Sequence, residues 1–289
     1  MDAKTVTDLI MENAFIDRVK ASLGGDKQRY SEDIYGDVRV CRLSLDEKTE
    51  KYGQGRYVTV YTPKLYSLDE KGQKKLSMIV SYEISSLIKK HVNDSLTYQS
   101  SALVVGIGNR EITPDAVGPL TSEKINVTRH ISRISPNEFK KMGVCQISSV
   151  ACGVMGDTGM DTLEIIKGVV DRIKPDVVIA VDALASKECG TLGAAIQLSD
   201  AGITPGAGIG NRQSDVNFNT LGVPTIAIGV PTVVSAHTLI CGLLPEMTDE
   251  KVFSKLGKNF FVCPKECDIL CSVSAKVLSD AINGALSVI

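Results

Sequence analysis

Hydrophobic and polar positions follow two different patterns along this chain of 289 residues. In residues 38–65 they alternate on either side of Tyr52-Gly-Gln-Gly55, which predicts a β-hairpin with a glycine-containing turn. In residues 75–91 the apolar residues recur at helical spacing, and they do so again in residues 5–23, before a pair of glycines. The N-terminal third is therefore predicted to contain two helices and one hairpin.

After residue 102 the pattern changes, and short apolar runs alternate with longer helical stretches. The runs interpreted as strands are Leu103–Val105, Ile147–Val150, Val177–Val181, Ala194–Leu198 and Thr225–Ile228. Helices are predicted at residues 158–173 and 268–286. Such alternation is typical of a parallel sheet between helices. We predict an α/β fold, with a mostly parallel twisted sheet, helices on both faces and the N-terminal β-hairpin as an added decoration.

Composition narrows the classes of partner. Hydrophobic residues make up 43% of the chain, and its net charge of −2 lacks the basic surplus of a nucleic-acid-binding surface. The N-terminus lacks the basic start and apolar core of a signal peptide, and the apolar runs are too short to span a membrane. We therefore expect a cytoplasmic protein with reduced thiols that binds neither nucleic acid nor membrane directly.

Two aspartates are the strongest candidates for chemistry. Asp182 directly follows the apolar run 177–181, and Asp115 lies in the loop after the run 103–105. In open parallel sheets, functional residues gather beyond the carboxyl ends of the strands. A buried acid is costly unless it is paired or functional. Two acids placed there would activate a water and protonate a carbonyl, although Asp115 fits a turn or helix cap equally well.

Two glycine-containing loops are candidates for binding substrate. Gly108 and Asn109 form a predicted turn whose backbone amides would lie near a developing oxyanion. The same segment begins a dinucleotide-binding pattern, but Glu111 stands where that pattern needs its third glycine. In the polar loop 206–220, Arg212 and Asp215 are candidate substrate contacts. A surface connector explains that loop equally well.

The sequence leaves a metal site open as an alternative. His237 follows the last apolar run, and with Asp115 and Asp182 it would form a site of two carboxylates and one histidine. Three cysteines, at positions 263, 267 and 271, are spaced by four and would share one face of a helix. They lack a CxxC pair, so a buried stripe is favoured over zinc. The main hypothesis needs no cofactor.

Several longer segments match one known family in the expected order. They are Val105–Asn109, Thr113–Pro119, Val127–His130, Gly153–Gly156, Ile165–Val169, Lys174–Ala185, Leu221–Pro224 and Ile228–Val234. With these segments the chain closely resembles the germination protease of spore-forming bacteria. The resemblance implies an endopeptidase of the spore core that degrades small acid-soluble spore proteins early in germination. It also implies a fold like that of hydrogenase maturation proteases.

The resemblance further implies an atypical aspartic peptidase, whose two essential aspartates match Asp115 and Asp182. Such a pair would share one proton and titrate as a unit, so no order is assigned to the two. The family is made as an inactive homotetrameric zymogen, cleaved between an acidic and an apolar residue. Asp8 and Leu9 fit that cleavage site. Residues 1–8 would be the propeptide, and residues 9–289 a single peptidase domain.

Overall fold

The computed structural model describes residues 8–10, 30–45, 54–92, 96–207, 214–243 and 260–288, with the side chains of residues 241 and 242 left aside. The helix predicted for residues 5–23 lies largely outside the described residues, as does most of the predicted propeptide. Among the described residues, no helix is both long enough and apolar enough to cross a membrane.

The strands of the described chain form one sheet, in the order β1-β2-β3-β7-β8-β6-β4-β5, with β9 paired to β8. They are β1 (Tyr30–Tyr35), β2 (Val38–Leu45), β3 (Gly55–Tyr61), β4 (Ser101–Ile107), β5 (Gln146–Gly153), β6 (Val177–Ser186), β7 (Ala195–Ser199), β8 (Thr225–Ser235) and β9 (Phe261–Val262). The α/β class is confirmed, and every run interpreted as a strand lies in one, apart from Ala194, which directly precedes β7.

The sheet is mixed rather than mostly parallel. The pairs β5–β4, β4–β6 and β6–β8 are parallel, whereas β7 runs antiparallel to both β8 and β3. Only residues 187–194 connect β6 to β7. A parallel return needs a crossover of a dozen or more residues, so β7 has to run antiparallel. The predicted parallel arrangement is therefore correct for β5, β4, β6 and β8 and wrong for β7.

The predicted hairpin is confirmed as β2 and β3, which pair in antiparallel register. It is not a separate decoration, because β3 continues the main sheet through β7. Val58 and Val60 of β3 join the same apolar cluster as Ile196 and Leu198 of β7. Pairing with β3 also covers the backbone groups that β7 would otherwise expose at an edge.

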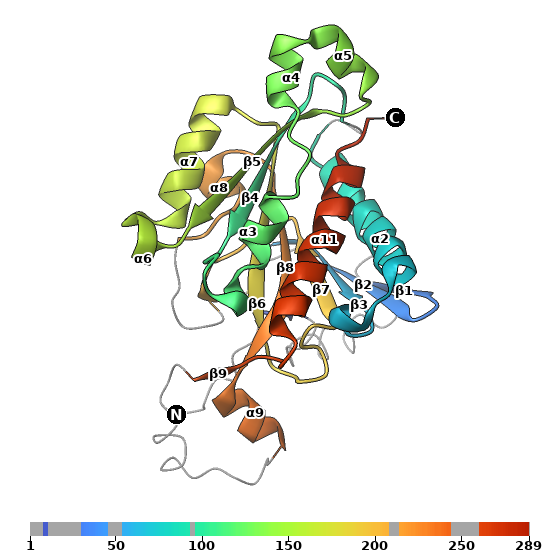
Figure 1. Ribbon diagram of the computed structural model, residues 1–289, viewed down its shortest axis with the longest axis vertical. Coiled ribbons are helices and arrows are strands. Elements are labelled where there is room, and N and C mark those ends of the chain that lie inside the picture. Colours follow the sequence, from blue (N-terminus) through green and yellow to red (C-terminus); the bar gives the residue numbers. More distant parts are fainter. Residues whose placement is uncertain are drawn as a thin grey trace.

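Helices cover both faces of the sheet, as predicted. The helical elements are the 3-10 helices η2 (Leu65–Ser67) and η3 (Thr113–Asp115), and α2 (Glu70–Lys89), α3 (Val117–Ser122), α4 (Arg129–Ile134), α5 (Pro136–Lys141), α6 (Met155–Thr158), α7 (Thr162–Ile173), α8 (Phe218–Leu221), α9 (Ala236–Leu243) and α11 (Cys267–Ala285). Figure 1 shows α2 and α11 side by side on one face and α7 on the other. The capping box of Asp161 and Glu164 starts α7.

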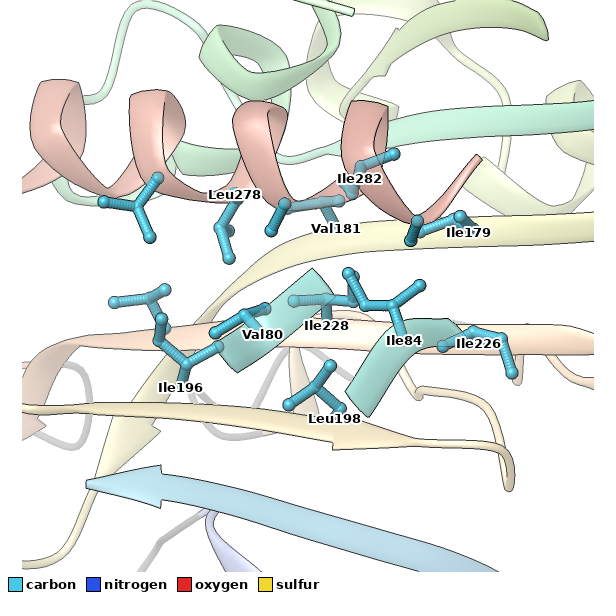
Figure 2. Close-up of a cluster of buried hydrophobic side chains, with 14 of the residues drawn as sticks. Val80, Ile84, Ile179, Val181, Ile196, Leu198, Ile226, Ile228, Leu278 and Ile282 are labelled. Atoms are coloured by element: carbon cyan, nitrogen blue, oxygen red, sulfur yellow. The ribbon is translucent and has the colours of Figure 1, made fainter. Parts of the chain in front are cut away.

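The larger core lies between the sheet and the helices α2 and α11 (Figure 2). Its labelled side chains are Val80, Ile84, Ile179, Val181, Ile196, Leu198, Ile226, Ile228, Leu278 and Ile282. Each large apolar side chain buried there stabilises the fold by about 1.5–3 kcal/mol. The central strands are therefore held firmly, and residues at the positions between these apolar ones point to the opposite face.

Candidate active site

Asp115 lies at the end of η3, in the loop that follows β4. One of its carboxylate oxygens, Oδ2, accepts a hydrogen bond of 2.6 Å from the backbone N–H of Asn109. Gly108 adopts a φ of +114°, and a Cβ at that position would lie 2.2 Å from the carbonyl oxygen of Asp115. Glycine is needed here because the loop folds back onto its own start. The Gly108–Asn109 turn thus holds Asp115, and the N–H of Asn109 is occupied by its carboxylate.

Two contacts tie this loop to the rest of the fold. The hydroxyl of Thr232 on β8 donates a hydrogen bond of 2.6 Å to the carbonyl oxygen of Pro114. The thiol of Cys271 on α11 donates one of 3.1 Å to the carbonyl oxygen of Thr113. Asp115 is therefore positioned from three elements: β4, β8 and α11.

Asp182 lies within β6, not at its end. The strand continues to Ser186, and Asp182 pairs with Gly229 of β8. On its other side, pairing between β6 and β4 stops at Val181 with Gly106. Asp182 was expected at the end of its own strand, and for β6 this is wrong. Asp182 does lie level with the place where the neighbouring strand β4 ends. Asp182 is 5% exposed, and its Oδ1 accepts a hydrogen bond from the N–H of Ala183 at 2.8 Å.

Gly118 brings the two aspartates together. A Cβ on this residue would lie 2.2 Å from the carbonyl oxygen of Ile107 and 2.4 Å from that of Val181. The start of α3 therefore packs directly against the backbone where the pairing between β4 and β6 ends. Val181, one of the residues that it contacts, directly precedes Asp182. Asp115 stands three residues before Gly118 on the same short segment.

The electrostatic environment differs between the two carboxyl groups. Burial and, next, the negative charge of Asp115 raise the pKa of Asp182 well above its usual range. Burial also raises the pKa of Asp115, but the hydrogen bond from Asn109 opposes this by stabilising the charged form. The pKa values of both carboxyl groups are therefore raised, and that of Asp182 is raised the more strongly.

The segment Asp8–Ile10 lies against β6 and β7, close to this pair. The N–H of Asp8 donates to the carbonyl oxygen of Ala185 at 2.9 Å, and the N–H of Ala185 donates to the Asp8 carboxylate at 2.8 Å. The charge of Asp8 contributes to the raised pKa of Asp182. Leu9 is fully buried against Leu184 and Ala195. The residues on either side of the bond proposed for cleavage thus contact β6 at Leu184 and Ala185, two and three residues after Asp182.

The other candidates have different surroundings. Asp215 accepts a hydrogen bond of 2.6 Å from Thr204 where two short segments bridge, and Arg212 lies outside the described residues. His237 is the second residue of α9. In the described part of the chain, no three His, Cys, Asp or Glu side chains gather as a metal site would require, and this holds for Asp115, Asp182 and His237.

Sequence reasoning missed Gln197, whose side chain bonds to both Asp8 and Ile10. The available signal was a lone amide in the otherwise apolar run Ala194-Ala-Ile-Gln-Leu198. Its partners could not be read from the run, because they lie 187 and 189 positions away in the chain.

Comparison with known proteins decides the family. A model of the germination protease family matches residues 25–244, which is most of the chain. The chain belongs to the germination protease family. The resemblance seen in the sequence is thereby confirmed. Germination proteases are peptidases, so this protein is a hydrolase that acts in spore germination.

Individual germination proteases align over most of their own length. The protein of Clostridium tetani is 39% identical over 284 residues, covering 87% of this chain and 85% of the relative. That of Bacillus subtilis is 36% identical over 293 residues, covering 81% and 78%. That of Oceanobacillus iheyensis is 35% identical over 318 residues, covering 89% and 86%.

Among solved structures, a NiFe hydrogenase maturation protease from Thermococcus kodakarensis matches with a TM-score of 0.35 and 18% identity. The match covers 66% of this chain and 97% of that protein. At this score the likeness carries no argument about the site.

Proposed function

We propose that this germination protease is a self-processing aspartic endopeptidase that uses Asp115 and Asp182 and cleaves after an acidic residue. One observation carries the proposal: Asp8 and Leu9 lie docked against the part of β6 that follows Asp182, with the acidic side chain bound and the apolar one buried. A bond held in this way resembles a substrate bound in its site. Residues 1–8 would then be the propeptide, and residues 9–289 the peptidase domain.

The subsites of the docked segment match an acidic residue followed by an apolar one. The backbone N–H of Ala185 meets the carboxylate of Asp8, and charge-assisted hydrogen bonds of this kind are among the stronger ones. Leu9 packs in an apolar cluster to which Tyr61 and Ile203 also contribute. Small acid-soluble spore proteins are the proposed substrates in trans, cleaved at sites of the same kind.

The environments of the two acids suggest their roles. Asp182, with the more strongly raised pKa, holds the shared proton, and Asp115 is the charged base. Asp115 takes a proton from a water whose oxygen adds to the carbonyl carbon of Asp8. Asp182 gives its proton to the carbonyl oxygen, which forms a neutral diol.

Collapse of the diol completes the reaction. The C–N bond breaks, and its electron pair stays on the nitrogen of Leu9, which takes the proton from Asp115. One diol hydroxyl returns its proton to Asp182. The products are a carboxyl-ended propeptide and a chain that begins at Leu9, and both acids regain their starting states.

The decisive experiment replaces each acid by its amide. The full chains with Asp115→Asn and Asp182→Asn are expected to lose self-cleavage at the Asp8–Leu9 bond, followed by intact mass under mild acid or dehydrating conditions. Both are also expected to lose activity on a small acid-soluble spore protein. Asp176→Asn is the matched control, because Asp176 is an exposed acid just before the other end of β6. Substantial cleavage by either amide variant would reject the aspartate pair.

The family resemblance also supports a homotetramer in the cytoplasm of the spore. Sedimentation of the unprocessed chain tests the assembly, and a monomer at micromolar concentration would reject it.

A further inference from the structure

The side chain of Gln197 brackets the peptide unit that joins Asp8 to Leu9. Its Nε2 donates to the carbonyl oxygen of Asp8 at 3.1 Å, and its Oε1 accepts from the backbone N–H of Ile10 at 2.7 Å. A backbone N–H can only donate, so the atom that faces Ile10 has to be the oxygen. This fixes the orientation of the amide and leaves its N–H₂ group facing the Asp8 carbonyl.

This pair of bonds copies the bonding of a parallel β-strand. In a parallel ladder, one residue donates to the carbonyl before its partner and accepts from the N–H after it. The Gln197 side chain makes both bonds around Leu9. A single side chain thus fixes the register of the segment across the proposed cleavage site.

Gln197 also lies in the same row of the sheet as Asp182. Asp182 pairs with Gly229 on β8, and Gly229 pairs with Gln197 on β7. Side chains in one row point to one face, and two strand spacings separate these backbones by about 10 Å. Gly229 has no side chain in between, and Leu184 occupies the place where its Cβ would be. Asp182 and Gln197 therefore lie on either side of the sheet surface against which Leu9 packs.

A group that stabilises the developing oxyanion has to lie within hydrogen-bond distance of the carbonyl oxygen that gains the charge. The turn amide of Asn109, which the sequence suggested, is already bonded to the carboxylate of Asp115. The Nε2 of Gln197 already donates a hydrogen bond of 3.1 Å to the carbonyl oxygen that would gain the charge.

We propose that Gln197 is the oxyanion donor of this peptidase. As water adds to the carbonyl carbon of Asp8 and loses a proton to Asp115, the π electron pair of the C=O bond moves onto oxygen. The Nε2–H of Gln197 donates a hydrogen bond to that oxygen without giving up its proton, while Asp182 supplies the proton that neutralises it. The inference rests on the proposed function, because the Asp8–Leu9 bond defines the oxygen concerned.

The test is the rate of self-cleavage of the full chain, followed by intact mass. Gln197→Met keeps the length of the side chain and removes its donor, and the cleavage rate is expected to fall about 10²–10³-fold, as on loss of other oxyanion donors. Gln146→Met is the matched control: Gln146 is another half-buried strand glutamine, bonded to Ser132 and the carbonyl of Gln99. It is expected to cleave within twofold of the wild-type rate. A Gln197→Met rate within threefold of wild type would overturn the inference.

A second substitution separates charge stabilisation from simple holding of the segment. Ile10→Pro removes the backbone N–H that donates to Oε1 of Gln197. The hydrogen bond from Nε2 to the Asp8 carbonyl can still form. If Gln197 stabilises the oxyanion, adding Gln197→Met to Ile10→Pro still slows cleavage at least about tenfold. If Gln197 only positions Ile10, the second substitution has no further effect. Should the methionine variant fail to fold, Gln197→Asn, whose amide is one methylene shorter, replaces it.

The results distinguish the two proposals. A wild-type chain that never cleaves between Asp8 and Leu9 overturns both. A chain that cleaves there, is inactivated by Asp182→Asn and is unaffected by Gln197→Met overturns the role of Gln197 alone.

Discussion

The strand that carries Asp182 and the loop that carries Asp115 hold the same functional group in opposite ways. Asp182 lies inside a paired central strand and is buried, so its pKa rises strongly. Asp115 lies on one turn of 3-10 helix, half-buried, with a backbone N–H on its carboxylate. The difference shows how the pKa values of two chemically identical side chains can be raised by different amounts, because each is placed on a different kind of element.

The largest effect is expected where strand and loop touch. Gly118→Ala would place a methyl group within 2.4 Å of the carbonyl oxygens of Ile107 and Val181. Because both are backbone atoms of central strands, α3 has to move, and with it Asp115. We expect a loss of about 3 kcal/mol in the free energy of unfolding and nearly complete loss of cleavage.

Gly168→Ala is the control for that substitution. Gly168 lies within α7, and apart from its neighbours and the adjoining backbone of the helix no atom lies within 4 Å of an added Cβ. Alanine there should stabilise the chain by about 1 kcal/mol and leave cleavage unchanged. Normal cleavage by Gly118→Ala, measured beside this control, would show that the contact does not position Asp115.

The buried position of Asp182 in its strand predicts that the stability of the protein depends on pH. The raised pKa means that folded Asp182 holds its proton to a higher pH than the same residue in the unfolded chain. The stability that this gives is complete below about pH 3.9, the usual pKa of aspartate, and is lost as pH rises toward the folded pKa. The loss is at most about 1.4 kcal/mol per pH unit.

Asp182→Asn stays neutral at every pH and removes this dependence. The free energy of unfolding of the variant, minus that of the wild type, is therefore expected to increase with pH in denaturant titrations between pH 4 and neutrality. Asp176→Asn controls for the substitution itself. Parallel curves for wild type and Asp182→Asn would contradict the difference between strand and loop.

The smallest effect is expected at the anchor of the loop. Thr232→Val removes the hydroxyl that holds the carbonyl oxygen of Pro114 and keeps the shape of the side chain. We expect a loss of about 1 kcal/mol in stability and a several-fold slower cleavage, because Asp115 is less firmly held. Thr225→Val on the same strand removes a hydroxyl bonded to Val223, at the far end from the loop. If both variants cleave equally fast, the anchor has no part in positioning Asp115.

The sequence predicted the strands around Asp182 well, because an apolar run that meets an acid is visible locally. It did not predict the direction of β7, although the short connection after β6 contained that information. Gln197 could not have been assigned a partner from sequence, because its contacts depend on residues 8–10 folding back across the sheet. Local pattern therefore located the acids, and long-range pairing determined what surrounds them.

The docked segment Asp8–Ile10 is covalently joined to the domain that it contacts. A tethered ligand is present at its site at an effective concentration in the millimolar range, whatever the concentration of the protein. A spore protein arriving from solution would have to compete with that local concentration until the Asp8–Leu9 bond is cut. The segment would thus act as both the first substrate and a competitive inhibitor. Cleavage would free the place held by Asp8 when residues 1–8 diffuse away, whereas Leu9 and Ile10 would remain joined to the domain.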